Sequence, residues 1–253
     1  MEKGSLVAYF GGRQVPLADA RVSVLSHAFL YGTALFEGIR GYRSASRDGI
    51  LLFRLREHYQ RLERSCRILG ISLKQDLETL CRLTTDLVKA NRFQEDIYVR
   101  SIAYKSAERI GLHLSDESDL VIATLPFGKN TNDERPLAMG ISSWRRAEDN
   151  AIPGRAKVSG GYVNLALAAS EVRNAGYDEA ILLSEDGHVS EAAGMNLFLV
   201  RTAAQVAAAG SVDRRPVGNG KAGPVTTRLR ELYGQVVWGQ VARYSDWITR
   251  VAV

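Results

Sequence analysis

Apolar positions in the first half of the chain follow two different spacings, which predict strands and helices in separate blocks. Leucine-rich runs with a helical period predict helices over 56–69 and 75–91. Short apolar or alternating runs predict strands, two of them around the hairpin signal Gly11-Gly12, at 7–9, 14–17, 50–53, 97–104 and 120–125. Between them, the glycines and aromatic residues of 26–42 predict a packed, partly irregular helix that leads into a strand. This block order is typical of an α+β domain.

The second half of the chain begins with the polar stretch 127–136, whose Gly and Pro residues favour a linker. We therefore expect a small domain over 1–128 and a larger domain over 129–253. Apolar runs in the second part predict three strands and two helices, the first helix stopped by Gly176 and the last starting near Pro224. The strands are expected at 138–144, 180–184 and 189–200, and the helices at 162–175 and between 220 and 239.

Composition narrows the functional classes. The 253 residues are 45% hydrophobic and 24% charged, which is ordinary for a soluble globular protein. The net charge of +5 comes from arginines that are spread among acidic residues, which favours a solvated surface over nucleic-acid binding. Without an apolar run of about 20 residues or a secretory signal, we expect a cytoplasmic protein without a membrane partner. Two cysteines and four scattered histidines predict neither a disulfide framework nor a metal site.

Three residues in the second half suggest pyridoxal phosphate (PLP) chemistry. Lys157 precedes Gly160-Gly161 in a loop over 150–161, Tyr162 follows it, and Glu191 stands in the predicted strand 189–200. A PLP enzyme needs an amine for a Schiff base and a carboxylate that keeps the pyridine nitrogen protonated. A phenol can bond the ring oxygen. A single lysine is usually a solvated surface residue, so the neighbouring small residues and the other two groups carry the hypothesis.

Several motifs keep the order found in one known family. The stretches AKVSGGYVNLALAASEVRNAGYDEAILL and VSEAAGMNLFLV resemble the core of the branched-chain amino-acid aminotransferases, which are fold-type IV PLP enzymes. SHAFLYGTALFEGIRGY, FRLREHYQRLERSCRILGI and IYVRSIAY are similar to that family's small domain, and GNGKAGPVTTRLRELY is similar to its C-terminal part. The resemblance covers nearly the whole chain. It implies an α/β protein with an α+β small domain and a larger, mixed α/β, barrel-like domain.

The resemblance also implies a role for each matching residue. Lys157 would be the Schiff-base lysine, Glu191 would hold the pyridinium nitrogen, and Tyr162 would bond the ring oxygen. Arg61 would bind the cofactor phosphate, a task that its guanidinium geometry suits. The substrate side would be lined by Tyr31, Phe36, Tyr98 and Arg100. Without the resemblance, Arg61 is better explained as a surface arginine and the aromatic residues as core packing.

One segment of the family pattern is missing from this chain. Family members continue after the strand that ends near Val200 into a PGITR-like phosphate loop, and later reach a GTAA loop. Here Val200-Arg201 is followed directly by Thr202 and Ala203, which match the second loop and would meet the cofactor phosphate and the substrate carboxylate. The large domain is therefore expected to lack roughly fifty residues, more than a whole βαβ unit of about 30 residues.

The resemblance implies an activity and two rivals to it. The expected reaction is PLP-dependent transfer of an amino group from Leu, Ile or Val to 2-oxoglutarate, which gives glutamate, in a homodimer or higher homo-oligomer. The first rival is another fold-type IV activity, that of a D-amino-acid aminotransferase or an aminodeoxychorismate lyase. The second rival is a catalytically inactive remnant that lost cofactor binding with the missing segment.

Overall fold

The chain folds into two compact units. The computed structural model describes residues 6–127, 135–197 and 207–253. The first unit comprises 1–128 together with 155–160 and 237–253, and the second comprises 129–154 and 161–236. The expected domains, 1–128 and 129–253 with a linker at 127–136, stay a prediction. The Lys157 loop and the C-terminal segment differ from the expected domains, because they pack with the first unit.

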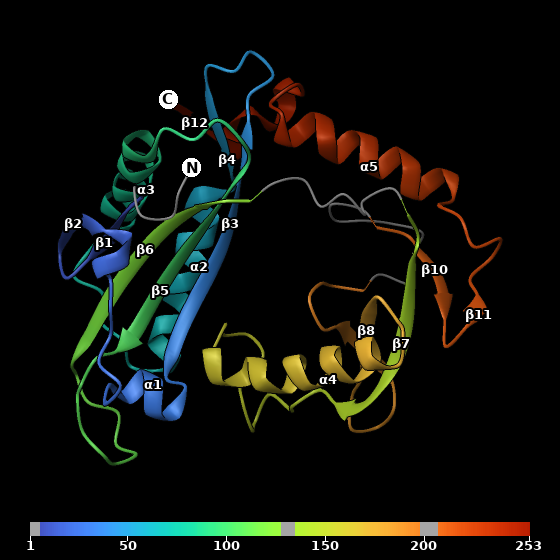
Figure 1. The fold of residues 1–253 in the computed structure, drawn as a ribbon, viewed down its shortest axis with the longest axis horizontal. Helices are drawn as coiled ribbons and strands as arrows, with labels where there is room; N and C mark the ends of the chain where they lie inside the picture. The colour runs from blue at the N-terminus through green and yellow to red at the C-terminus, as the bar shows by residue number, and fades with distance from the viewer. Residues whose placement is uncertain (1–5, 128–134, 198–206) are drawn as a thin grey trace. The chain divides into compact units, whose positions relative to one another are not determined.

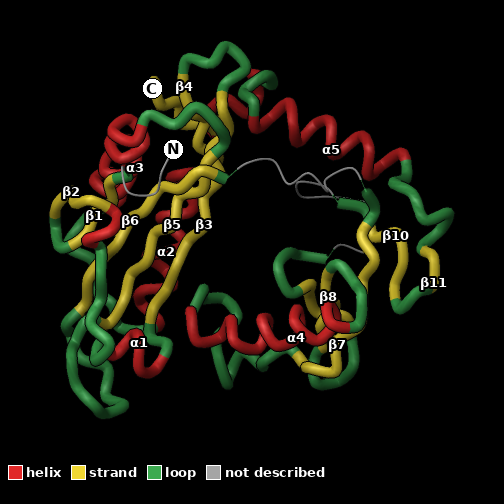
Figure 2. Tube along the Cα trace, viewed as in Figure 1, coloured by secondary structure: helices red, strands yellow, loops and turns green. Residues whose placement is uncertain are grey.

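The first unit is built on a seven-stranded sheet with the strand order β12-β4-β3-β5-β6-β1-β2 (Figures 1 and 2). Each pair of neighbours in it is antiparallel. The strands are β1 (Val7–Phe10), β2 (Arg13–Pro16), β3 (Ala34–Arg43), β4 (Gly49–Phe53), β5 (Ile97–Lys105), β6 (Ser118–Pro126) and β12 (Ile248–Ala252). The long central strands β3 and β5 pair from Ala34 opposite Tyr104 to Gly41 opposite Ile97.

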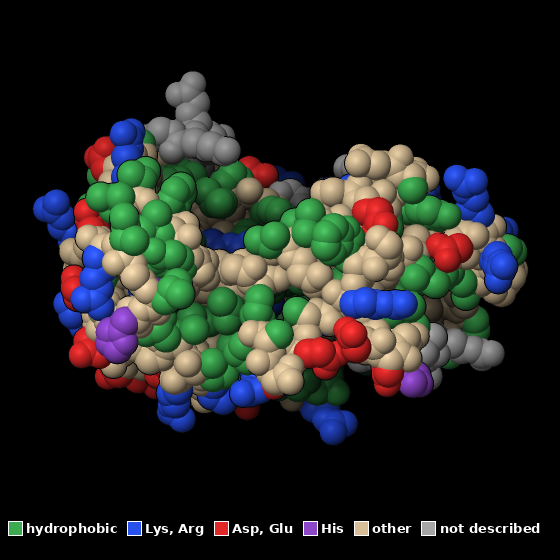
Figure 3. Space-filling view, turned by 90° about the horizontal axis from the view of Figure 1, so that it is seen from below, with side chains coloured by type: hydrophobic (Ala, Val, Ile, Leu, Met, Phe, Trp, Pro, Cys, Tyr) green, Lys and Arg blue, Asp and Glu red, His purple; other side chains and the backbone are tan. Residues whose placement is uncertain are grey.

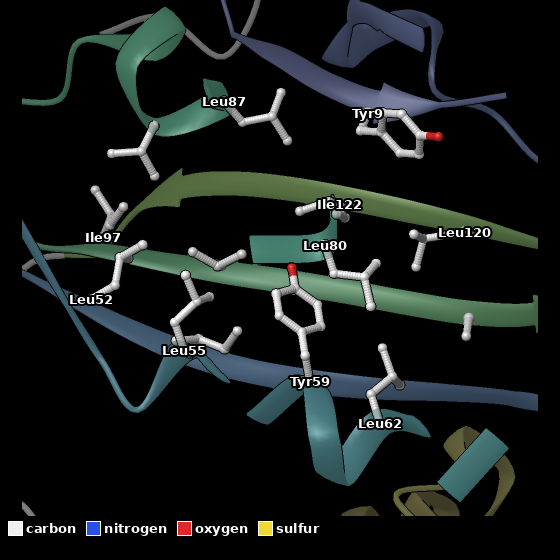
Figure 4. Close-up of a cluster of buried hydrophobic side chains, with 14 of the residues drawn as sticks. Tyr9, Leu52, Leu55, Tyr59, Leu62, Leu80, Leu87, Ile97, Leu120 and Ile122 are labelled. Atoms are coloured by element: carbon white, nitrogen blue, oxygen red, sulfur yellow. The ribbon is translucent and has the colours of Figure 1, made fainter. Parts of the chain in front are cut away.

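Helices α2 (Leu55–Ile68) and α3 (Leu77–Asn91) lie against this sheet, α2 on β3 and α3 on β1 and β6. Their apolar faces produce the main core, in which Tyr59, Leu62 and Leu80 point toward the strands (Figure 4). The buried Tyr59 hydroxyl hydrogen-bonds Thr84 and, at 2.9 Å, Ser101. Burial of this hydroxyl raises the pKa of Tyr59 to about 12. Both helices confirm the helical periods at 56–69 and 75–91.

The second unit holds a five-stranded sheet with the order β11-β10-β7-β8-β9. Strand β7 (Leu137–Arg145) runs parallel to β8 (Glu179–Leu183), and α4 (Tyr162–Asn174) lies between them in the chain and packs on both. The remaining strands are β9 (Val189–Ala192), β10 (Ala209–Val212) and β11 (Arg215–Pro216), and α5 (Pro224–Val237) follows. The buried residues Leu165, Ala168 and Val172 of α4 meet Leu182 of β8 in one core cluster.

The last predicted strand, 189–200, is shorter than expected. It ends at Ala192, because the amide of Ala192 bonds the carbonyl of Met195 and the amide of Ala193 bonds Ala180. The chain therefore turns at Gly194, and residues 198–200 lie outside the described part. Among the described residues, every helix is too short or too polar to cross a lipid bilayer.

Candidate active site

Lys157 lies on a segment that is fixed against the first unit's sheet. The amide of Phe36 donates to the carbonyl of Lys157 at 3.1 Å, and Val158 forms a bridge with Leu35. The amide of Gly160 bonds the carbonyl of Gly32 at 3.1 Å. Gly32 has a φ of 69°, and a Cβ there would come within 2.7 Å of Gly160. Glycines thus allow this loop to approach the start of β3 closely.

Three of the predicted substrate-side residues gather on one face of β3 and β5. The guanidinium of Arg100 lies 4.2 Å from the ring centre of Phe36 and 5.0 Å from that of Tyr98. The amine of Lys157 is 5.6 Å from the same Phe36 ring centre. Gly38 stands opposite Arg100, and a Cβ at Gly38 would overlap the Tyr98 hydroxyl. This face therefore combines an amine, a guanidinium and two aromatic rings.

Arg61 lies on the other face of β3. Glu37 follows Phe36 in the strand, so its side chain points to the side that α2 covers. Glu37 is fully buried and accepts hydrogen bonds from Nε and Nη2 of Arg61, both at 2.6 Å. His58 Nδ1 lies 2.8 Å from the same carboxylate. Burial alone would raise the pKa of Glu37, but hydrogen bonds from Arg61 and His58 outweigh it and hold that pKa below 4.5.

Tyr31, the fourth predicted substrate-side residue, belongs to a surface region. It ends α1 (His27–Tyr31), packs 4.7 Å from the His27 ring and accepts a hydrogen bond from the amide of Gly111 at 3.1 Å. The segments 22–31 and 110–114, which this bond joins, carry several exposed apolar side chains, and we call them the apolar patch: Val22, Val24, Leu25, Phe29, Leu30, Tyr31, Ile110, Leu112 and Leu114. Figure 3 presents the first unit from the side of α1, where many hydrophobic side chains reach the surface.

Glu191 belongs to the second unit, where it lines a cavity of about 580 Å³. The other lining residues are Arg146, Ala147, Asp149, Gly154, Ser190, Asn196 and Leu197. Arg146 Nε donates to Oε1 of Glu191, and the two side chains keep 20% and 29% of their surface exposed. Ligand pockets of about 300–1,000 Å³ are common, so a single aromatic ring with substituents fits this volume. A carboxylate on the wall matches what a pyridinium nitrogen requires.

The remaining predicted residues are less informative. Tyr162 is the first residue of α4 and packs partly buried against that helix's core cluster. Thr202 and Ala203 lie outside the described residues. The structure thus brings Lys157 together with Phe36, Tyr98 and Arg100 in the first unit. Arg61 lies across β3 from them, and Tyr162 and Glu191 belong to the second unit.

Two residues at these positions were not singled out from the sequence. Glu37 could have been noticed, because an acidic residue inside an apolar strand is almost never buried without a partner. Arg146 follows β7 in the run SSWRRAE, in which two adjacent arginines are equally plausible surface residues. Its pairing with Glu191 depends on strand positions. Among the described residues, no three His, Cys, Asp or Glu side chains gather as a metal ion would require.

Comparison with known proteins places this geometry among aminotransferases. The family model described as amino-transferase class IV matches residues 34–211. A probable branched-chain-amino-acid aminotransferase of Aquifex aeolicus (strain VF5) is 32% identical, over 96% of each chain. The structure of the branched-chain aminotransferase from Thermoproteus uzoniensis with norvaline matches with a TM-score of 0.88 and 30% identity, covering 98% of this chain and 100% of that one. The PLP form of the Thermobaculum terrenum enzyme matches with a TM-score of 0.88 and 25% identity, over 100% of both chains.

The alignment with one relative leaves positions of that relative unfilled by this chain. The match to the Aquifex aeolicus protein extends over 299 aligned positions, whereas this chain has 253 residues. At least 46 positions, the difference between 299 and 253, therefore have no residue here. Because the alignment covers 96% of that protein, these positions lie inside the shared region. A relative that matches along nearly its whole length thus contains residues that this chain lacks.

Proposed function

Because this chain belongs to the amino-transferase class IV family, we propose that it transfers the amino group of branched-chain L-amino acids to 2-oxoglutarate with PLP as its cofactor. One observation carries the proposal. The family match spans 34–211 and includes Lys157, Glu191 and the cavity that Glu191 lines. Leucine, isoleucine and valine are the donors that the descriptions of the similar proteins suggest. We propose the cytoplasm as the compartment in which this amino-acid chemistry takes place.

The cofactor would be held by residues from several elements. Glu191 would accept the hydrogen bond of the ring nitrogen, and Tyr162 would donate to the ring oxygen. Arg61, oriented by Glu37, would bind the phosphate through its guanidinium. Thr202 and Ala203 would add backbone amides and a hydroxyl to the phosphate and substrate carboxylate. When bound, PLP supplies an aldehyde that takes up the amino group and a ring that accepts electron density.

Lys157 would act as both anchor and proton carrier. Its amine would hold the cofactor before substrate arrives and would then remove the proton from the substrate Cα atom. Its backbone is fixed to Phe36, so the side chain starts from a defined position. A side chain that transfers protons benefits from a fixed backbone position, because proton transfer requires hydrogen-bond distances of about 2.6–3.2 Å.

The face shared by β3 and β5 would bind the substrates. Phe36 and Tyr98 offer apolar ring surface for a branched aliphatic side chain. Arg100, stacked on both rings, would bind a carboxylate of 2-oxoglutarate or glutamate. Tyr31 would complete the site, and we propose that it does so within a homodimer or a higher homo-oligomer. The apolar patch supports this assembly, because exposed apolar side chains gathered in neighbouring segments are typical of association sites.

One observation favours a second candidate, a catalytically inactive relative. The at least 46 unfilled positions correspond in our reading of the sequence to the loop that helps to bind the cofactor phosphate. Loss of several charge-assisted hydrogen bonds would weaken PLP binding strongly. In this second reading the chain keeps the family's fold but neither the cofactor nor the reaction.

The deciding experiment combines a spectrum with an assay on the purified 253-residue chain. PLP is added and the visible absorbance is recorded before and after leucine, and glutamate formed from leucine and 2-oxoglutarate is then measured. We expect a protein-bound PLP band that leucine converts, and glutamate production that Lys157→Ala abolishes. Turnover of D-alanine without leucine turnover would instead favour the D-amino-acid activity. A chain that leaves PLP unbound is the inactive relative.

A further inference from the structure

We propose that Arg146 is a positioning residue that fixes the carboxylate of Glu191 toward the ring nitrogen of the cofactor. This inference rests on the proposed function. Glu191 accepts from Arg146 Nε through one oxygen, Oε1. A carboxylate has about four lone-pair positions, so Oε2 keeps the capacity to accept a ring N–H. One hydrogen bond to Oε1 thus orients the carboxylate and leaves Oε2 available as an acceptor.

The backbones of both residues are fixed to the same strand. The amide of Arg146 donates to the carbonyl of Leu183 in β8 at 2.8 Å. Glu191 stands opposite Leu182 on the other edge of β8. Because β8 lies between β7 and β9, the ion pair joins the residue that follows β7 to a residue of β9 across the end of β8. The distance that the side chains must span is therefore set by the sheet.

A side chain of α4 holds the same turn from the helix side. The Oδ1 atom of Asn164 accepts the amide of Ala147 at 3.3 Å, and its Nδ2 atom donates to the carbonyl of Arg145 at 2.9 Å. The two bonds bracket Arg146 in the chain. Arg146 therefore has backbone restraints on both sides, which is the support that a precise functional geometry needs.

The guanidinium also lies at the wall of the cavity that Glu191 lines. A Cβ added to Gly154 would lie 3.4 Å from Arg146 Nη2 and 3.9 Å from Asp149 Oδ1. Both distances are ordinary van der Waals contacts, so the guanidinium of Arg146 and the carboxylate of Asp149 each lie close to Gly154. Both members of the Arg146–Glu191 pair remain partly exposed to this space.

Stability is a weak reason for such a pair. The two side chains keep only 20% and 29% of their surface exposed, so the cost of desolvating both charges offsets much of their attraction and the net contribution of the pair to stability is small. The positioning role is different, because it reduces the freedom that Glu191 would lose when the cofactor binds. Replacing Arg146 should consequently change PLP binding more than folding.

The test is a PLP titration of the full chain, followed by absorbance, with Arg146→Met, Arg146→Lys and the control Arg145→Met. Arg145 is the exposed neighbour at the end of β7. We expect Arg146→Met to raise the Kd for PLP about tenfold, as for the loss of one hydrogen bond to a charged group. Arg146→Lys should recover part of the affinity, and Arg145→Met should bind as the unmodified chain does. Thermal melts without PLP should agree within about 3 °C for all variants.

A double-mutant cycle separates positioning from a general structural effect. If Arg146 acts through Glu191, then Arg146→Met in a Glu191→Gln background should change the Kd less than about twofold. A full tenfold rise of the Kd in that background, or an unchanged Kd for Arg146→Met alone, overturns the inference. PLP binding by the unmodified chain would still support the proposed function. Failure of the unmodified chain to bind PLP overturns both.

Discussion

Glu37 shows how one residue on β3 can connect the core to a predicted binding residue. Its side chain is fully buried, yet the Arg61 side chain that pairs with it keeps 41% of its surface exposed. A buried carboxylate stays charged only when it is paired and hydrogen-bonded, and Arg61 and His58 supply both. Hydrogen bonds to the buried carboxylate of Glu37 on β3 thus set the orientation of Arg61.

We predict that Glu37→Gln lowers the free energy of unfolding by about 1.5–3 kcal/mol at pH 7, the range for hydrogen bonds to charged groups. The pKa of Glu37 in the folded chain lies below 4.5, so its charged form stabilises the fold above that pH. This contribution is lost as the pH falls through the folded-state pKa. Urea unfolding of both proteins between pH 7 and pH 3 should show the difference shrinking in acid.

Glu78→Gln provides the matched control. Its ion pair with Arg56 is exposed, with 68% and 53% of the two side chains accessible. Such a pair contributes about 0–1 kcal/mol. A stability loss as large as that of Glu37→Gln would show that burial does not distinguish the two pairs.

Gly38 decides the position of Tyr98. Because a Cβ at Gly38 would overlap the Tyr98 hydroxyl, Gly38→Ala should displace the ring from the face that it shares with Arg100. We expect the KM for leucine to rise about tenfold, as for a misshapen apolar pocket, with a smaller change in kcat. Steady-state kinetics measure this split. Gly223→Ala, where a Cβ has open space, should leave both constants unchanged.

Among the elements, β12 is a strand that the apolar pattern of the sequence did not predict, and it is held by tertiary pairing. This five-residue strand pairs with β4 along its whole length, from Ile248 opposite Phe53 to Ala252 opposite Gly49. Its neighbour Trp247 stacks on Arg54, whose guanidinium lies 3.6 Å from the ring centre. The C-terminal segment therefore closes one edge of the first unit's sheet.

We predict that Val251→Asp destabilises the chain by at least about 3 kcal/mol, because it buries an unpaired charge. Val251 is 2% exposed and belongs to the main core. Ala252→Asp, one position further on the exposed side of the strand, should change stability by less than about 0.5 kcal/mol. Denaturant midpoints of the two variants provide the measurement. Equal losses would contradict the alternation of buried and exposed positions in β12.

At the scale of the whole molecule, two properties bear on function: the positions of a relative that this chain does not fill, and the exposed apolar patch. The chain lacks at least 46 positions of a relative that it otherwise matches over 96% of its length. In the seven-stranded sheet of the first unit, each strand from β12 to β2 is nevertheless hydrogen-bonded to its neighbours. The effect of the missing segment is therefore expected in the second unit and in cofactor affinity.

The apolar patch leads to a prediction about assembly. Phe29 and Ile110 expose 67% and 86% of their surfaces, so glutamate at either position should fold normally but oppose association. Light scattering after gel filtration should give at least twice the 27.8 kDa of one chain for the unmodified protein. Phe29→Glu and Ile110→Glu should give the single-chain mass. Val225→Glu, on α5, is the control, and a monomeric unmodified chain would end the homo-oligomer proposal.

The sequence by itself determined the local elements and the chemical groups. The helical periods over 56–69 and 75–91 became α2 and α3, and the apolar run 97–104 became β5, because side-chain spacing reports directly which face is buried. The lysine and the carboxylate of the predicted cofactor site were recognisable from residue type and motif. Their roles stay predictions until the spectra are measured.

The tertiary structure alone decided which distant residues meet. The pairing of β12 with β4, of Glu37 with Arg61 and of Arg146 with Glu191 joins positions that no local period connects. Strand order and register set these contacts, and a shift of one residue would turn each side chain to the opposite face. The attachment of the Lys157 segment to β3 has the same origin, since it depends on a close approach that Gly32 permits. Such contacts follow from the packing of whole sheets, and the sequence pattern of one element does not contain them.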